Sequence, residues 1–368
     1  MDIPWKDVRK IVVLNLIANT VGDTLMVGPV IQVLKRHCPK AEITCTASPQ
    51  NAPLLEGLPQ LDRIVVVPQL ADVGAKVGKA RKALRYASLM RFVVKKLREI
   101  KPDVCFILQP NFAPSQLVPW IARVPYRVGY TYKGSRFSWA LTHSTSFRGT
   151  YETFEYYRHF IEVNFDILRA VGIPINPEDT VVRKFVSKEA KAWANDFLKK
   201  HKLTAKDKLV AVQAGAKWEN KRWPVERFVE VAKVLAGKHH ATLLLFGAPQ
   251  EKETNDKIAA AIPGKAIPVL GESLEHVAAL LERCTLAFGN DSGIMHLASS
   301  VGTKPAVIYA MSIPENSGPR GPGGVLPIMG PVDKDKPVLS GDDVEEGIKR
   351  MKNVTVEMAL AVLEPALK

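Results

Sequence analysis

Acidic, basic and hydroxyl side chains that can do chemistry follow several apolar stretches of the chain, each directly before a helical pattern. One such loop reads Gly289-Asn290-Asp291-Ser292-Gly293, and His296 follows Ser292 by one helical turn. Helix N-terminal N–H groups favour an anion, glycine allows its close approach, and a hydroxyl can donate to it. The combination predicts a diphosphate site. Taken singly, Asp or Ser there is commonly a helix cap, and a helical His is commonly just packed.

A second loop, "AGAKWENKRWPVERF", follows the apolar run 209–213. It carries small residues and then cations: Gly215, Ala216, Lys217, Lys221 and Arg222. Cations at a strand end can neutralise a phosphate leaving group. A surface loop of solvated lysines fits the same residues, so this loop alone does not decide between the two interpretations.

Two single acids stand at comparable places. Asp23, in "VGDTLMVGP", follows the apolar run 11–17. A carboxylate at a helix N-terminus is stabilised in its ionised form and can accept a proton from a hydroxyl, although a plain helix cap is the alternative. Glu251, in "FGAPQEKE", can hydrogen-bond a ribose or simply complement a helix dipole.

The elements that must position these residues follow from length and pattern. With 368 residues, 46% of them hydrophobic and 24% charged, the chain should form two compact domains. Strand-like runs alternate with helical patterns, which predicts an α/β fold of two Rossmann-like, doubly wound lobes. In such sheets ligands gather at the carboxyl ends of the strands, where the chemistry-bearing loops lie.

The expected boundaries are residues 1–178 for an N-terminal acceptor-binding lobe and 179–342 for a C-terminal nucleotide-sugar-binding lobe. The run 343–368 is expected to be a C-terminal helix that packs back on the first lobe. A long amphipathic helix over 152–171 should close the first lobe. The Pro- and Gly-rich stretch 314–331 is interpreted as a long loop.

Charge is unevenly distributed. Lys and Arg outnumber Asp and Glu by 51 to 37, and the run from Lys76 to Lys101 carries ten basic residues against the single acid Glu99. Such a run attracts a nucleic acid, an anionic membrane face or a phosphorylated glycolipid, and a solvated helix face is an equally good interpretation.

Several classes of protein are not indicated. No window approaches the roughly 20 apolar residues of a membrane span, the start lacks a signal-peptide core, and the four cysteines form no CxxC pair, so a reducing cytoplasm is expected. GxGxxG after the first strand, GxxxxGK[ST], HExxH and a strand-end DxD are all missing, so neither a dinucleotide fingerprint, a P-loop nor a metal site is expected.

Four stretches in this order resemble glycosyltransferase family 9, the ADP-heptose:lipopolysaccharide heptosyltransferases, over most of the chain. They are "VGDTLMVGPVIQVLKRHCPKAEIT", "FIEVNFDILRAVGI", "AGAKWENKRWP" and "GNDSGIMHLASSVGT". The resemblance implies the GT-B architecture, in which two Rossmann-like lobes face a central cleft and the second lobe holds most of the nucleotide-sugar.

The resemblance also implies roles for residues. Asp23 matches the general base that activates the acceptor hydroxyl. The positions that match donor-binding residues are Ala216, Lys217, Lys221, Glu251, Leu270, Asp291, Ser292, Gly293 and His296. Among them, Lys221 matches a phosphate-contacting lysine, Glu251 a ribose-binding acid and Leu270 the place of the nucleobase.

The expected activity is therefore an inverting transfer of heptose from ADP-heptose to an inner-core lipopolysaccharide acceptor, without metal or other cofactor. The basic run lies in the acceptor lobe, so Lys79, Arg81, Lys82 and Arg85 are candidate acceptor-binding residues. We expect a cytoplasmic protein, peripheral at the inner face of the inner membrane, with no nucleic-acid partner.

Two alternatives remain open. One is a nucleotide-sugar 2-epimerase, which can share this fold and would act without an acceptor. The other, of a different class, is a basic nucleic-acid-binding protein, which rests on the net charge of +14. The sequence carries no interleaved aromatics of a recognised RNA or DNA module.

Overall fold

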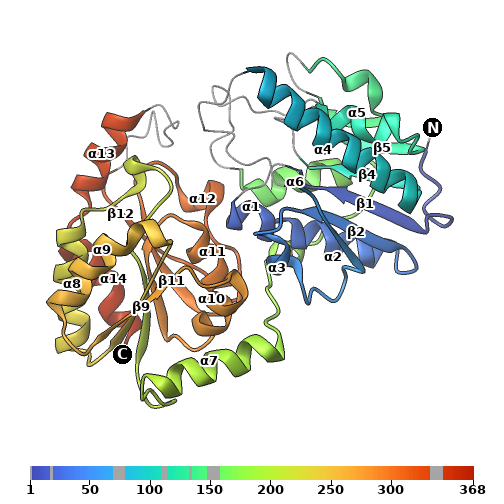
Figure 1. Ribbon diagram of the computed structural model, residues 1–368. Coiled ribbons are helices and arrows are strands. Elements are labelled where there is room, and N and C mark those ends of the chain that lie inside the picture. The colour runs from blue at the N-terminus through green and yellow to red at the C-terminus, as the bar shows by residue number, and fades with distance from the viewer. Residues whose placement is uncertain are drawn as a thin grey trace. The chain divides into compact units, whose positions relative to one another are not determined.

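The computed structural model describes residues 2–16, 20–68, 79–108, 114–131, 135–146, 158–331 and 343–368 (Figure 1). The chain divides into two compact units. The first comprises residues 1–155 and 160–180, and the second comprises 156–159 and 181–368. The domain boundary was expected after residue 178, and the structure divides the chain after Thr180.

The first unit is built on a parallel six-stranded sheet of order β3-β2-β1-β4-β5-β6. Its central strands are short β-branched runs, buried throughout in β4 and almost throughout in β1, as parallel strands covered on both faces should be. The strands are β1 (Lys10–Leu14), β2 (Glu42–Ala47), β3 (Arg63–Val66), β4 (Val104–Ile107), β5 (Tyr126–Thr131) and β6 (His143–Ser146).

Helices connect these strands and cover the sheet (Figure 1). They are α1 (Val21–Leu25), α2 (Val27–His37), α3 (Ala52–Leu55), α4 (Lys79–Ile100), α5 (Pro114–Ile121) and α6 (Phe160–Arg169), with 3-10 turns η1 (Ser138–Ala140) and η2 (Pro177–Thr180). The long helix expected over 152–171 is shorter: Arg158 and His159 are not helical, and α6 runs only from Phe160 to Arg169. Residues 151–157 of the expected helix lie outside the described part of the chain. Gly172, at φ +78°, follows its end.

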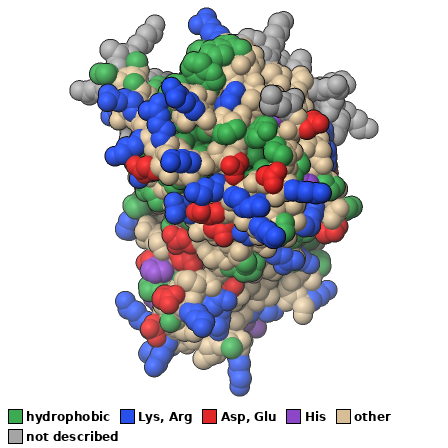
Figure 2. Space-filling model, turned by 90° about the vertical axis from the view of Figure 1, so that its right-hand side faces the viewer, with side chains coloured by type: hydrophobic (Ala, Val, Ile, Leu, Met, Phe, Trp, Pro, Cys, Tyr) green, Lys and Arg blue, Asp and Glu red, His purple; other side chains and the backbone are tan. Residues whose placement is uncertain are grey.

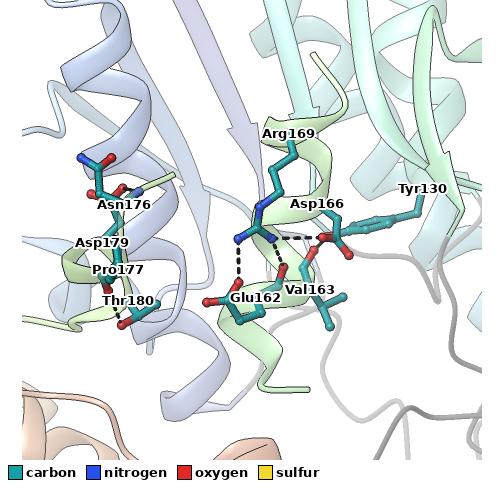
Figure 3. A network of polar contacts seen from close by, with 9 residues as sticks. All are labelled: Tyr130, Glu162, Val163, Asp166, Arg169, Asn176, Pro177, Asp179 and Thr180. Carbon is teal, nitrogen blue, oxygen red and sulfur yellow. Dashed lines mark hydrogen bonds and ion pairs between the residues drawn. The ribbon is translucent and has the colours of Figure 1, made fainter. Parts of the chain in front are cut away.

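Polar contacts hold α6 against the sheet (Figure 3). The Tyr130 hydroxyl, from β5, donates a hydrogen bond of 2.5 Å to the Val163 carbonyl. On the same helix Arg169 pairs with Glu162 at 2.7 Å and with Asp166 at 3.2 Å. Helix α6 is therefore tied to β5 near its beginning, and the ion pairs of Arg169 stabilise the helix itself.

The second unit repeats the plan with a parallel sheet of order β12-β11-β10-β7-β8-β9. Its strands are β7 (Leu209–Gln213), β8 (Thr242–Gly247), β9 (Ala266–Leu270), β10 (Leu286–Asn290), β11 (Lys304–Tyr309) and β12 (Leu326–Met329). Its helices and 3-10 turns are α7 (Lys188–Lys200), η3 (Glu219–Lys221), α8 (Val225–Gly237), η4 (Pro249–Glu251), α9 (Lys252–Ala261), α10 (Leu274–Leu281), α11 (Gly293–Ser300), α12 (Pro314–Ser317), α13 (Val344–Asn353) and α14 (Val356–Ala366). The predicted α/β class and doubly wound lobes are confirmed.

Two expectations about the end of the chain are wrong. The stretch 314–331 is not a loop throughout, because it contains α12 and the edge strand β12, which pairs in parallel with β11. The run 343–368 forms two helices rather than one, and their apolar residues, Met351, Leu363 and Leu367 among them, belong to the core of the second unit. An amphipathic helix docks on the nearest uncovered apolar surface, which here is the sheet edge at β11 and β12.

Among the helices of the described residues, none combines the length and the apolar character that a membrane crossing requires. The four cysteines are buried and unpaired.

Candidate functional site

The donor residues predicted from the sequence follow four strands of the second sheet that are neighbours in the order β10-β7-β8-β9. Because these strands are parallel, their carboxyl ends meet at one edge of the sheet. Three loops and the end of β9 bring the candidates there: 214–223 after β7, 248–251 after β8, and 291–293 after β10.

Asn290, the last residue of β10, connects the loop 214–223 to strand β10. Its side chain is fully buried; Nδ2 donates to the Ala214 carbonyl at 2.7 Å, and Oδ1 accepts from the Trp223 N–H at 3.1 Å. Both ends of the 214–223 loop are thus held against β10. Asn290 had no role assigned from the sequence, where the available signal was an amide at the end of an otherwise apolar strand.

Lys221 and Asp291 form a partly buried ion pair within this cluster. Lys221 Nζ lies 2.5 Å from Asp291 Oδ2, and the Ser312 hydroxyl donates to the same oxygen at 2.6 Å. Burial opposes ionisation of Asp291, but Lys221, followed by Ser312 and His296, holds the pKa of this carboxyl below its usual value. The Asp291 carboxylate therefore holds the lysine in place through Oδ2, and its own contact with a donor stays a prediction.

Ser292 opens helix α11 in the position of an N-cap, yet its side chain caps nothing. Its backbone is extended, and its hydroxyl oxygen is buried without a hydrogen-bond partner in the described part of the chain. Gly293 follows as the first helical residue, and the first N–H groups of any helix lack intrahelical partners. A buried hydroxyl with no partner among the described residues, at a helix N-terminus, favours the binding of an anion.

Glu251 and Leu270 lie together over two glycines at the ends of β7 and β8. A Cβ atom on Gly215 would fall 1.6 Å from Glu251 Oε1, and one on Gly247 would fall 3.0 Å from Glu251 Oε2 and 3.2 Å from Leu270 Cδ2. The Ala248 N–H and the Gln213 amide donate to Glu251 Oε2 at 2.9 and 3.2 Å. The acid is thus oriented with its second oxygen still available.

The two remaining positions of the second loop differ from each other. Ala216 is buried, and its carbonyl accepts from Arg222 Nε at 2.9 Å. Lys217 is exposed, with its ammonium 5.7 Å from the centre of the exposed Trp218 ring. Lys221, rather than Lys217, is therefore the lysine that the structure brings to Asp291.

His296 and a histidine that the sequence did not single out, His159, influence each other electrostatically. Burial lowers the pKa of His159 to about 3, with Arg320 and His296 lowering it further against a hydrogen bond to the Gly318 carbonyl. That bond measures 2.8 Å. His159 lies in the string "YYRHF" inside the expected long helix, a context that gave no sign of a buried imidazole near α11.

In the first unit, Asp23 lies in the first turn of α1 after β1. The alternative that Asp23 is the helix cap is wrong, because Thr20 is the N-cap and its hydroxyl accepts from the Asp23 N–H at 3.2 Å. The Asp23 side chain is exposed and makes no hydrogen bond or ion pair within the described residues. Its carboxylate is available for another use.

The candidate acceptor residues belong to α4. The side chains of Lys79, Arg81 and Lys82 lie outside what the structure describes, and Arg85 is exposed. Their role therefore stays a prediction. Within the described ranges, no three His, Cys, Asp or Glu side chains are grouped so as to hold a metal ion.

Known proteins are similar to this chain over most of its length. Residues 90–326 match glycosyltransferase family 9 (heptosyltransferase). Lipooligosaccharide heptosyltransferase 2 of Haemophilus influenzae is 26% identical over 361 residues, which are 94% of this chain and 96% of that protein.

Solved structures share the GT-B fold. A glycosyltransferase family 9 protein from Veillonella parvula superposes with a TM-score of 0.77 at 24% identity and covers 98% of this chain and 97% of its own. The ADP-heptose lipopolysaccharide heptosyltransferase II of Escherichia coli does so at 0.74 and 22%, and covers 97% and 98%. The matched region spans well over half of the sequence, and the chain belongs to glycosyltransferase family 9, the heptosyltransferases.

Proposed function

We propose that this glycosyltransferase moves heptose from ADP-heptose to an inner-core lipopolysaccharide acceptor, with inversion at the anomeric carbon. The observation that carries the proposal is the buried Ser292 hydroxyl, which has no hydrogen-bond partner among the described residues and stands at the N-terminus of α11, next to the Asp291 that holds the cation of Lys221. A diphosphate supplies the acceptor oxygens that this group and the first N–H groups of the helix lack. The two named heptosyltransferases to which the chain is similar support the sugar and the acceptor class.

The remaining donor contacts follow from the same edge of the sheet. Glu251 would accept from the ribose hydroxyls, because Ala248 and Gln213 hold one of its oxygens in place. Leu270, next to Gly247, would pack against the nucleobase. Ala216, buried with its carbonyl turned to Arg222, and Lys217 would border the sugar and phosphates.

In the transfer, an acceptor hydroxyl oxygen forms a bond to the anomeric carbon while the bond from that carbon to the diphosphate oxygen breaks. The Asp23 carboxylate takes the hydroxyl proton, and ADP leaves with its new negative charge on the terminal phosphate. Lys221, His296 and the N–H groups at the start of α11 stabilise that charge, and the reaction needs no metal in this scheme.

The acceptor is anionic, and the candidate residues for it are the first-turn cations of α4 together with Arg85. Such an acceptor is a lipid-linked saccharide, so we place the reaction in the cytoplasm at the inner face of the inner membrane. Nucleic acid is not a partner in this scheme.

The test separates donor binding from chemistry. Titration with ADP, UDP and GDP should show tightest binding of ADP, and Asp23→Asn should abolish transfer while leaving the ADP dissociation constant within about twofold. Asp7→Asn, which changes another exposed carboxylate of the first unit, is the matched control and should keep full activity. A preference for UDP, or an active Asp23→Asn enzyme, would refute the proposal.

The 2-epimerase alternative makes a separate prediction. An epimerase converts its nucleotide-sugar without an acceptor, whereas a transferase given ADP-heptose alone should show only slow hydrolysis. Membership of family 9 favours the transferase. Analysis of products with donor alone decides between the two reactions on the same fold.

A further inference from the structure

A groove lies on the surface of the first unit, where α4 packs beside α5. It encloses about 570 Å³ and is lined by Met90, Arg91, Val94, Lys95, Arg98, Glu99 and Ile121. Arg98 donates to the Ile121 carbonyl at 3.1 Å, so the end of α5 is tied to α4 at one end of the groove. The floor is apolar and the rim is charged.

The rim carries a stripe of positive charge along one side of α4. Leu84, Arg91, Lys95 and Arg98 are separated by seven, four and three residues, which places them on one face of a helix, and all four are exposed. Glu99 is the single acid of the helix, and it pairs with Lys96 at 2.8 Å. No other acid of α4 therefore stands against the three cations of the stripe.

Large apolar side chains are exposed near the same place. Trp120 and Ile121, at the end of α5, are 46% and 37% exposed, Trp139 in η1 is 59% exposed, and Leu84 is 71% exposed. The Trp120 and Trp139 rings meet edge to face, with centroids 5.0 Å apart. In the upper part of Figure 2 hydrophobic side chains lie beside Lys and Arg side chains. Two exposed, mutually packed tryptophans are unusual unless a partner covers them.

We propose that the face formed by α4, the end of α5 and η1 docks on the surface of an anionic phospholipid bilayer. Arg91, Lys95 and Arg98 would bind the phosphates of the headgroups, while Trp120 and Trp139 enter the zone between headgroups and acyl chains, where tryptophan is favoured. An apolar protein partner would leave three cations buried and unpaired, which is unfavourable. Charge complementarity therefore selects the lipid surface.

The docking face is distinct from the proposed catalytic residues. Vesicle binding needs neither donor nor acceptor, so the proposal can fail while the proposed transfer stands, and the reverse also holds. Docking along α4 would bring the membrane beside the helix that carries the candidate acceptor residues at its other end.

The first experiment measures co-sedimentation of the full chain with vesicles of phosphatidylcholine, with and without phosphatidylglycerol. The wild type should bind only the anionic vesicles, and Arg91→Glu with Lys95→Glu should weaken that binding by about 25-fold or more, since each cation contributes about fivefold. Lys199→Glu with Lys200→Glu, on exposed positions of α7, makes the same change in net charge and should leave binding nearly unchanged. Equal losses in both pairs, or binding to neutral vesicles alone, would overturn the proposal.

The second experiment reports the tryptophans. Vesicles with brominated acyl chains should quench the wild-type fluorescence, and Trp120→Phe with Trp139→Phe should lose most of that quenching. Unchanged quenching overturns the proposal. The proposal is also overturned if inorganic phosphate displaces the protein from vesicles more than chloride does at equal ionic strength, because that result would identify a free-phosphate site. A change of oligomeric state in the α4 variant without a change in vesicle binding would identify a protein interface instead.

Discussion

Replacing Ser292 by alanine should make the protein more stable and its ADP binding weaker. In the ligand-free structure the Ser292 hydroxyl is buried and has no partner among the described residues. A buried hydroxyl without a hydrogen bond costs about 1–3 kcal/mol, so its removal should be neutral or raise the free energy of unfolding by about 1 kcal/mol. For a unit of this size that corresponds to a melting temperature about 2–4 °C higher.

The effect on ADP binding should have the opposite sign. In the proposed complex Ser292 donates to a charged phosphate oxygen, and such a hydrogen bond contributes about 1.5–3 kcal/mol. Since about 1.4 kcal/mol is a factor of ten, the dissociation constant of ADP should rise by about 10- to 100-fold. Calorimetric titration with ADP and thermal unfolding with and without ADP measure both quantities.

Two controls bracket the result. Ser292→Thr keeps the hydroxyl and should keep most of the ADP affinity. Ser187, the N-cap of α7, does accept a hydrogen bond, from the Ala190 N–H at 3.1 Å, so Ser187→Ala should lower stability by about 1 kcal/mol and leave ADP binding unchanged. If Ser292→Ala destabilised the protein as Ser187→Ala does, or bound ADP within twofold of wild type, the assignment of this hydroxyl to an anion site would be refuted.

Three further changes test the surroundings of the site. Gly215→Ala places a methyl 1.6 Å from a Glu251 oxygen, so it must displace that acid and should weaken binding of ADP more than binding of pyrophosphate, as titration with both would show. Burial lowers the pKa of His159 to about 3 from an ordinary 6.5, so on acidification the unfolded chain binds a proton at this imidazole before the folded chain does. The free energy of unfolding should therefore fall by about 1.4 kcal/mol per pH unit as the pH drops from 6.5 toward 3. Urea unfolding of His159→Gln at several pH values should lack this contribution. Gly347→Val puts a Cβ 2.8 Å from the Asn220 Cβ, so α13 should displace η3, which carries Lys221. The ADP dissociation constant should then rise several-fold, and a titration that gives the wild-type value would contradict this.

The sequence predicted the central strand β7 better than two of the edge strands. The apolar run 209–213 coincides with β7. β6 reads HSTS and carries no apolar residue, which an edge strand tolerates because it has a neighbour on one side only. β12 reads LPIM, only four residues long, and Pro327 within it lacks an N–H, which an edge strand also tolerates. The Pro- and Gly-rich surroundings of β12 therefore favoured a loop.

The positions of the candidate loops were predictable, but the pairing of their side chains was not. Parallel strands bring their carboxyl ends to one edge whatever the loops contain, so the spacing of Lys221, Glu251 and Asp291 along the chain was enough to place them there. Ser312 contacts the Asp291 carboxylate because of the course of a loop after β11, 21 residues further along the chain. Thr20 rather than Asp23 caps α1 because of the backbone conformation between β1 and α1. Neither course can be read from the residue types.

Asp291 and Ser292 are neighbours in the chain, and the structure gives them complementary tasks. Asp291 Oδ2 accepts from both Lys221 and Ser312, so it fixes where the cation stands, while the Ser292 hydroxyl has no hydrogen-bond partner among the described residues. A lysine held at a fixed place need not be reorganised when negative charge develops on the leaving phosphate, which is how preorganised groups stabilise a transition state. The pair is electrically neutral before the donor arrives, so in the proposed complex the attraction for a diphosphate comes from the N–H groups at the start of α11 and the hydrogen-bond donors beside them. In the proposed complex the start of α11 binds the diphosphate, and Lys221, kept in place by Asp291, stabilises the negative charge that grows on the leaving phosphate.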